Sequence, residues 1–161
     1  MKKKYGFLAF LFAGILAISG CGESGDKKAG YGKQKAAYHV NYYDAKRQTG
    51  ALRNIQNHIN AVGAENIDVR VVMHGNGLSL LLYPEEVKNT KMKGGNANDK
   101  MQATIANLKS QGVKFSVCAN TLKGRKVSLD QLYDAEKADI VPSGVAEIAH
   151  LQSQGFAYMR P

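Results

Sequence analysis

The sequence predicts an α/β fold, a single three-layer domain with a mostly parallel central β-sheet. Short apolar runs alternate with amphipathic stretches along most of the chain, and this alternation is typical of parallel sheets covered by helices. A length of 161 residues is enough for one domain with its own core but not for two. Hydrophobic residues make up 44% of the chain, the usual share for a globular protein.

Residues 1–20 have the pattern of a secretion signal. Three lysines precede an apolar run from Phe7 to Ile18, which has the length of a signal core and is short for a membrane span. The run ends in ISGC, which resembles the bacterial lipobox, whose cysteine is lipidated. We therefore expect Cys21 to anchor a periplasmic protein to the cell envelope, and the glycine after it favours the outer membrane. An unmodified signal peptide and an uncleaved anchor helix are the alternatives.

The segment that follows the signal predicts a flexible tether. Residues 21–35 are rich in Gly, Lys and Ser, so we expect the folded domain to span residues 36–161. The formal net charge is +9 for the whole chain and +6 without the three signal lysines. This mild basicity indicates an ordinary solvated surface, and export argues against a nucleic-acid partner.

The first half of the domain predicts a strand, a helix and a second strand. Ala37–Tyr43 is rich in aromatic residues and predicts the first strand. Asp44 can cap a helix whose apolar residues recur every three or four positions, and Gly63 can end it. Ile67–Met73 predicts the second strand, and the two glycines soon after it favour a tight turn with exposed amides. Leu78–Tyr83 fits a short helix or a buried strand.

The second half continues the alternation. The polar segment 84–98 predicts an exposed excursion, and Met101, Ile105 and Leu108 mark the next helix. An apolar run that ends at Cys118 predicts a strand, followed by a polar turn over residues 120–126. A capping box predicts a short helix at 128–131, and a strand follows at 140–141. Val145, Ile148 and Leu151 lie on one face of a helix predicted at 145–154, and the last strand spans 156–159.

Cys118 is the main candidate for chemistry. It ends a predicted strand, where open α/β sheets place their binding crevices. With Cys21 lipidated, it is the only thiol expected to be free. Backbone amides at the start of a following helix would favour the thiolate, and Asn120 and Thr121 would add hydrogen-bond donors. The alternative is a buried, inert thiol, because cysteine is among the most buried residue types.

His74 is the second candidate, because it ends the preceding strand and can face the same crevice. A histidine there can act as an acid or a base, or can hold an anion. Gly75 and Asn76 offer ligand-binding groups in the same turn. The alternative is a turn histidine bonded to the backbone. The histidines at 39, 58 and 150 lack metal-ligand spacing, so we expect neither a metal nor another cofactor.

Several stretches together resemble the DsrE/DsrF-like family of small sulfur-handling proteins. They are VVMHG at 71–75, GVKFSVCANTL at 112–122, IVPSGVAEI at 140–148 and LQSQGFAY at 151–158. The resemblance covers about residues 37–160. It implies a compact α/β fold, assembly into homo-oligomers, and transfer of sulfane sulfur as a persulfide on one cysteine. Only Cys118 matches that cysteine, with His74 as its neighbour.

Two functions are therefore considered. In the first, an envelope protein carries sulfane sulfur on Cys118 and passes it from a donor to an acceptor thiol. In the second, the domain is a non-catalytic, membrane-tethered module that binds a small ligand or serves assembly. The chain departs from relay members of the family, which act in the cytoplasm, because it carries an export signal. It also lacks a second cysteine beside Cys118, so a relay needs another chain or a small thiol.

Overall fold

The computed structural model describes Met1 and residues 30–161, and it confirms the predicted α/β class. Five strands form one sheet in the order β4-β3-β2-β1-β5, and all neighbouring strands are parallel. The predicted signal, Cys21 and the tether up to residue 29 lie outside the described residues. The strands are β1 (Gln34–Val40), β2 (Ile67–Met73), β3 (Lys114–Cys118), β4 (Ile140–Val141) and β5 (Ala157–Met159).

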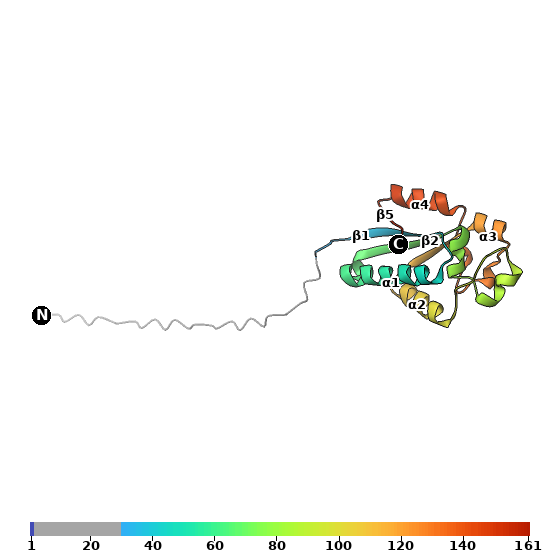
Figure 1. Cartoon of the computed structure of the whole chain (residues 1–161). Helices are drawn as coiled ribbons and strands as arrows, with labels where there is room; N and C mark the ends of the chain where they lie inside the picture. Colours follow the sequence, from blue (N-terminus) through green and yellow to red (C-terminus); the bar gives the residue numbers. More distant parts are fainter. Residues whose placement is uncertain (2–29) are drawn as a thin grey trace.

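Helices cover both faces of the sheet and make three layers (Figure 1). α1 (Ala45–Val62) and α2 (Asp99–Ser110) lie on one face, and α4 (Gly144–Ser153) lies on the other. α3 (Ala119–Arg125) directly follows β3. Among the described residues, none of the helices has both the length and the apolar character needed to cross a bilayer. Five 3-10 helices complete the fold: η1 (Ala64–Asn66), η2 (Gly75–Leu80), η3 (Pro84–Asn89), η4 (Leu129–Gln131) and η5 (Lys137–Asp139).

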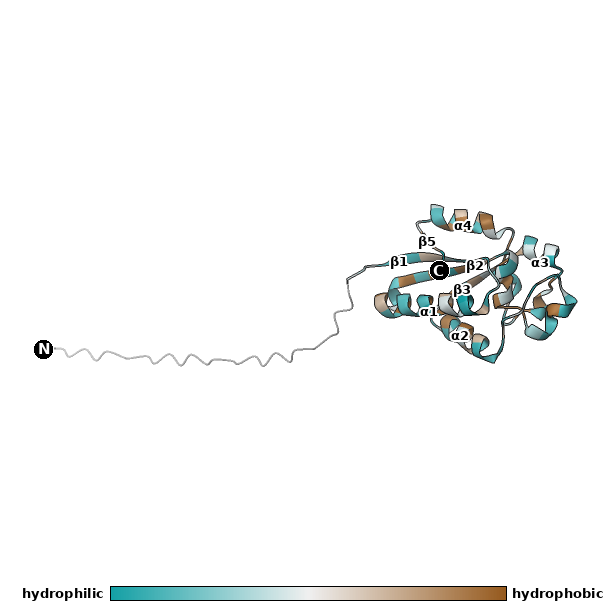
Figure 2. Cartoon of the chain, in the orientation of Figure 1, coloured by the Kyte–Doolittle hydropathy of each residue, from teal (hydrophilic) through white to brown (hydrophobic). Residues whose placement is uncertain are grey.

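The sheet divides the core into a large and a small cluster. The large cluster joins the sheet to α1 and α2, and hydrophilic residues cover the outer side of α1 (Figure 2). The small cluster joins Ala37 and Val72 of the sheet to Leu151 of α4 and to Phe156. Because side chains alternate along a strand, the residues two positions after Ala37 and Val72 lie on the α4 face as well. These residues are histidines, and both lie near the carboxyl ends of their strands.

α1 begins and ends where the sequence predicts, and α2 contains the three apolar residues that marked its helix. The Asp44 carboxylate accepts the Arg47 amide at 2.7 Å and caps α1, whereas the Asn98 side chain accepts the Met101 amide and caps α2. Gly63 ends α1 with a φ of 93°, a value that an L side chain rarely adopts. Local capping therefore agrees with the apolar periodicity at both helices.

The first strand lies three residues earlier than predicted, at Gln34–Val40 instead of Ala37–Tyr43. It also includes Gln34 and Lys35, which the sequence assigned to the tether. The prediction extended the strand beyond Val40 because Tyr42 and Tyr43 have a high β propensity, which tertiary contacts override. The buried Gln48 amide donates to the Tyr42 carbonyl at 2.7 Å, so this segment leaves the sheet and turns into α1.

The polar segment 84–98 is exposed along much of its length, as predicted, but it does not leave the body of the domain. Met92 and Ala97 are buried, and η3 forms at the start of the segment. The Asn96 side chain donates to Gln48 Oε1 and to the Tyr43 carbonyl, both at 2.8 Å. These hydrogen bonds return the segment to the body of the domain, so its polar residues serve as long-range contacts.

Two further predictions near the carboxyl edge of the sheet are corrected. Residues 120–125 form most of α3 instead of a polar turn, and Thr121 is the buried residue of this helix. Val145 does not share a buried face with Leu151, because it lies in the first turn of α4 and is 66% exposed. Both differences arise at the edge of the sheet, where α3 and α4 approach each other.

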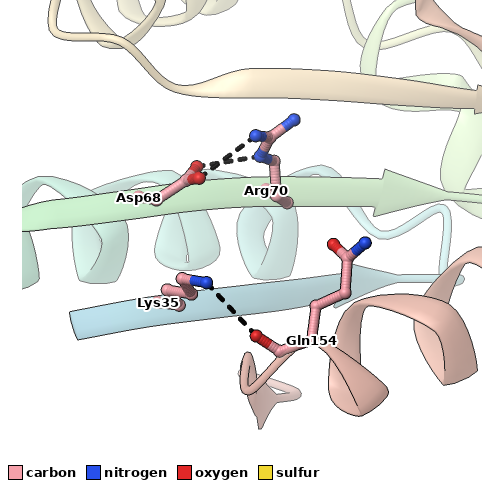
Figure 3. Close-up of polar contacts among 4 residues, drawn as sticks. All are labelled: Lys35, Asp68, Arg70 and Gln154. Carbon is pink, nitrogen blue, oxygen red and sulfur yellow. Dashed lines mark hydrogen bonds and ion pairs between the residues drawn. The ribbon is translucent and has the colours of Figure 1, made fainter.

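The amino edge of the sheet is held to the turn between α4 and β5 by polar contacts (Figure 3). Lys35 of β1 donates to the carbonyl of Gln154 at 3.3 Å. On β2, Arg70 makes two hydrogen bonds to Asp68 at 2.8 and 3.1 Å. The cations of Lys35 and Arg70 lie 5.6 and 5.8 Å from the centre of the Phe156 ring. These contacts are structural and lie at the opposite edge from Cys118.

We expect Gly77→Ala to lower the free energy of unfolding by about 3 kcal/mol, as overpacking a tight contact does. A Cβ at Gly77 would lie 1.9 Å from the Val40 carbonyl oxygen, a backbone atom that cannot move freely. Gly94→Ala is the matched control, because a Cβ there meets nothing within 4 Å. Urea unfolding of both variants measures the difference, and equal losses would contradict the close approach of η2 to β1.

Candidate functional site

A cavity of about 390 Å³ opens at the carboxyl edge of the sheet, between β2, β3, α3 and the start of α4. Five of the six residues that the sequence singled out in the domain line it, and Asn76 does not. The structure therefore brings the predicted thiol and the predicted histidine turn to one place. The lining residues are His74, Gly75, Cys118, Asn120, Thr121, Gly124, Arg125, Ser143, Gly144 and Val145.

The strand register explains this convergence. Val40 pairs with Met73, Met73 pairs with Val117, and Cys118 pairs with Val141. The carboxyl ends of four parallel strands therefore align, and the residues that leave them meet at one edge. Such an edge is where open α/β sheets bind ligands.

Cys118 is the last residue of β3, and its side chain is only 4% exposed. Burial raises the pKa of the thiol, but hydrogen-bond donors outweigh it and leave the pKa below its ordinary value. These donors are the Thr121 side chain and the backbone amides of Gly144, Thr121 and Asn120. They surround the sulfur from both α3 and α4. The site therefore favours the thiolate, which is the nucleophilic form of cysteine.

Thr121 links the histidine turn to the cysteine. Its hydroxyl oxygen accepts the Gly75 amide at 2.8 Å, and the same hydroxyl donates towards Cys118. Thr121 is 8% exposed, so this short chain of donors is shielded from water. The Gly75 amide therefore makes the Thr121 hydroxyl a stronger hydrogen-bond donor to the sulfur of Cys118.

Arg125 is a cationic residue in the lining of the cavity that no sequence pattern had indicated. Its guanidinium donates to the Asn76 side chain at 3.1 Å and to the Lys91 carbonyl at 3.2 Å. Asn76 therefore positions Arg125 instead of lining the cavity itself. Residues 118, 121 and 125 are spaced by three and four, the spacing of one helical face, so recognising α3 as a helix would have revealed this arginine.

His39 is a second residue that the sequence analysis missed. Its Nε2 lies 2.7 Å from Nε2 of His74, and its Nδ1 lies 2.8 Å from the Tyr158 hydroxyl. The centres of the two imidazole rings lie 4.7 Å apart and their planes differ by 26°, so the nitrogens meet edge to edge. Burial, the adjacent His74 and the Arg160 charge lower the pKa of His39 to about 4. Burial also lowers the pKa of His74.

The shifted prediction for the first strand explains why His39 was missed. With the strand placed at 37–43, residue 39 would lie in its interior, away from any crevice. The strand instead ends at Val40, so His39 lies one residue from the carboxyl edge. On that strand it shares the α4 face with Ala37, as His74 does with Val72. No short-range sequence signal reports this pairing.

The chemistry of the cavity is that of a nucleophile beside a cation and a neutral base. Cys118, whose lowered pKa favours the thiolate, and the cationic residue Arg125 line one cavity, which suits a small anionic electrophile, and His74 can accept a proton. Within residues 30–161, His, Cys, Asp and Glu form no group of three or more that could hold a metal ion.

We expect Thr121→Val to raise the pKa of Cys118, because the variant removes the hydroxyl that stabilises the thiolate. The difference in ultraviolet thiolate absorbance between each protein and its Cys118→Ser derivative, followed against pH, measures this pKa. Thr104→Val is the control, since the Thr104 hydroxyl donates to the Lys100 carbonyl on α2. An unchanged midpoint in Thr121→Val would show that the hydroxyl does not act on the sulfur.

The free energy of unfolding should fall on acidification from pH 6.5 towards pH 4. The unfolded chain protonates His39 near its ordinary pKa of 6.5, whereas the folded protein does so near 4. The unfolded state therefore binds the proton first as the pH falls, and stability is lost over that window. His39→Gln should flatten the decline, and His150→Gln at an exposed position should not. Equal slopes for wild type and His39→Gln, from urea unfolding at several pH values, would contradict the buried neutral histidine.

Comparisons with known proteins agree with this fold. The model of the DsrE/DsrF-like family matches residues 28–161. A solved structure of a protein of unknown function, MTH1491 from Methanobacterium thermoautotrophicum, is similar with a TM-score of 0.64 and 26% identity. The match covers 80% of this chain and 100% of that one. No curated protein matches the sequence. Since the family match spans the whole described domain, the chain belongs to the DsrE/DsrF-like family.

Proposed function

We propose that the protein carries sulfane sulfur as a persulfide on Cys118 and passes it to an acceptor thiol. Membership of the DsrE/DsrF-like family suggests a function of the sulfur-relay type. The observation that supports Cys118 as the carrier is the ring of hydrogen-bond donors around its sulfur, from Thr121, Gly144 and Asn120. A buried cysteine without such a role would ordinarily have a raised pKa, because burial disfavours the thiolate.

The loading step follows from the charges in the cavity. With thiosulfate as donor, the Cys118 thiolate attacks the outer sulfur, a new S–S bond forms, and the bond to the sulfonate sulfur breaks. Sulfite leaves with the electron pair, and the protein retains a persulfide anion. Arg125 lines the same cavity, and its positive charge would attract such a donor. The donors that stabilise the thiolate would also stabilise the persulfide anion.

The unloading step requires a thiol from outside the domain. Cys118 is the only cysteine among the described residues, so no resolving thiol lies beside it there. An acceptor thiolate would attack the outer sulfur, and the Cys118 thiolate would leave as the original nucleophile. Because Cys118 is 4% exposed, the acceptor must present its sulfur on a narrow group, such as a small thiol or an extended peptide.

The proposal includes a lipid anchor at the periplasmic face of the cell envelope and assembly into homo-oligomers. β1 is the first strand of the domain and enters the sheet at its amino edge, whereas Cys118 lies at the carboxyl edge. A tether attached before β1 would therefore leave the cavity on the side of the domain away from the attachment. This arrangement would keep Cys118 accessible to soluble partners.

Incubation with thiosulfate or polysulfide should add the mass of one sulfur atom to Cys118. Intact-protein mass spectrometry measures the adduct, and a reducing thiol should remove it. Cys21→Ser is the matched control for cysteine content and should keep the adduct, whereas Cys118→Ser should lose it. If wild type gains no sulfur at any donor concentration, the carrier function is wrong and a non-catalytic binding or assembly module becomes the better explanation.

A further inference from the structure

We propose that Tyr158, His39 and His74 form a proton relay that removes the proton of the acceptor thiol in the Cys118 cavity and delivers it to the surface at β5. The inference rests on the proposed sulfur transfer and assigns residues to its second step. It is carried by two hydrogen bonds, 2.8 Å from the Tyr158 hydroxyl to His39 Nδ1 and 2.7 Å from His39 Nε2 to His74 Nε2.

The relay spans the distance from the cavity to the solvent. His74 lines the cavity together with Cys118, and Gly144 packs closely against its ring. His39 is buried at 9% exposure, whereas Tyr158 is 42% exposed at the edge strand. Each member comes from a different strand or strand end, so the sheet holds them in line. A proton can therefore pass from the histidine in the cavity to the buried histidine and then to the tyrosine at the surface.

The two histidines can pass a proton without remaining charged. In one arrangement, His74 Nε2–H donates to His39 Nε2, His39 Nδ1–H donates to the Tyr158 oxygen, and His74 Nδ1 is free to accept a proton. When Nδ1 takes a proton, each hydrogen moves one place outward, and Tyr158 releases its own proton to water. The result is the opposite arrangement, in which both rings are again neutral.

The surroundings favour this neutral transfer over a lasting imidazolium. In the part of the chain that the structure describes, neither ring is hydrogen-bonded to a carboxylate. The charged groups nearby are cationic: Arg160 acts on His39, and Arg125 lines the cavity with His74. Cys118 is the other titratable group at that cavity. Both histidines have lowered pKa values, so each remains able to donate and accept near neutral pH.

Counting the protons released in each step shows that only unloading needs the relay. Loading from thiosulfate consumes a thiolate and releases sulfite, with no proton transferred. Unloading converts an acceptor thiol and the Cys118 persulfide anion into an acceptor persulfide anion, the Cys118 thiolate and one proton. The relay carries that proton away. Its loss should therefore slow unloading and leave loading unchanged.

The test measures loading and unloading separately, with two kinds of acceptor. With an alkyl thiol near neutral pH, His74→Gln should slow unloading by about 100-fold, within the range of general-base catalysis. His39→Gln should slow it by a smaller factor, because His74 keeps its basic nitrogen but loses its hydrogen-bonded proton acceptor. Tyr158→Phe should give a smaller loss and, at an exposed position, does not threaten folding. With an aromatic thiol that is already ionised, His39→Gln and Tyr158→Phe, whose side chains do not line the cavity, should match wild type.

Three possible results distinguish the relay from a structural role of the histidines and from failure of the carrier function. Loss confined to unloading by the alkyl thiol supports the relay, and His150→Gln, a histidine exposed on α4, should behave as wild type. Equal losses with both acceptors would indicate a structural role and overturn the relay while leaving the carrier function intact. Failure of wild type to load sulfur would refute the proposed function and, with it, this role for the histidines.

Discussion

The aligned carboxyl ends of β1, β2 and β3 are the constraint on which the candidate site depends. Parallel pairing in the observed register places Cys118 beside the turn that follows Met73 and places His39 within hydrogen-bond distance of His74. A one-residue slip would turn each of these side chains to the opposite face of the sheet. The chemistry therefore requires both the topology and the register, and no single motif contains it.

The start of α4 completes the site from above the sheet. Gly144 has no side chain, and a Cβ there would lie 2.8 Å from the Cβ of His74, so glycine permits the close approach of α4. The Gly144 amide then helps to stabilise the Cys118 thiolate. One glycine thus serves both the histidine and the cysteine. The donors on the other side come from α3, so the sulfur is held between two helix starts.

Sequence patterns predicted the fold class, β2 and the bounds of α1, because continuous apolar runs and capping residues act locally. They also predicted that Cys118 and His74 would share a cavity, since both end parallel strands. They failed where distant contacts decide the outcome. The Gln48 side chain bonds Ser79 and Asn96, which lie 31 and 48 residues away, so the packing of segment 84–98 against α1 could not be inferred locally. His39 was missed because its partner His74 lies 35 residues away, whereas Arg125 was missed because residues 120–126 were predicted to form a turn instead of a helix.

The central claim is that Cys118 is a reactive thiol instead of an inert part of the core. The most direct test is labelling of the folded full-length Cys21→Ser protein with a small uncharged alkylating agent near neutral pH. We expect complete labelling of Cys118 without denaturant, and we expect thiosulfate to compete with the label. A thiol that stays unlabelled in the folded protein and reacts only in denaturant would contradict the account.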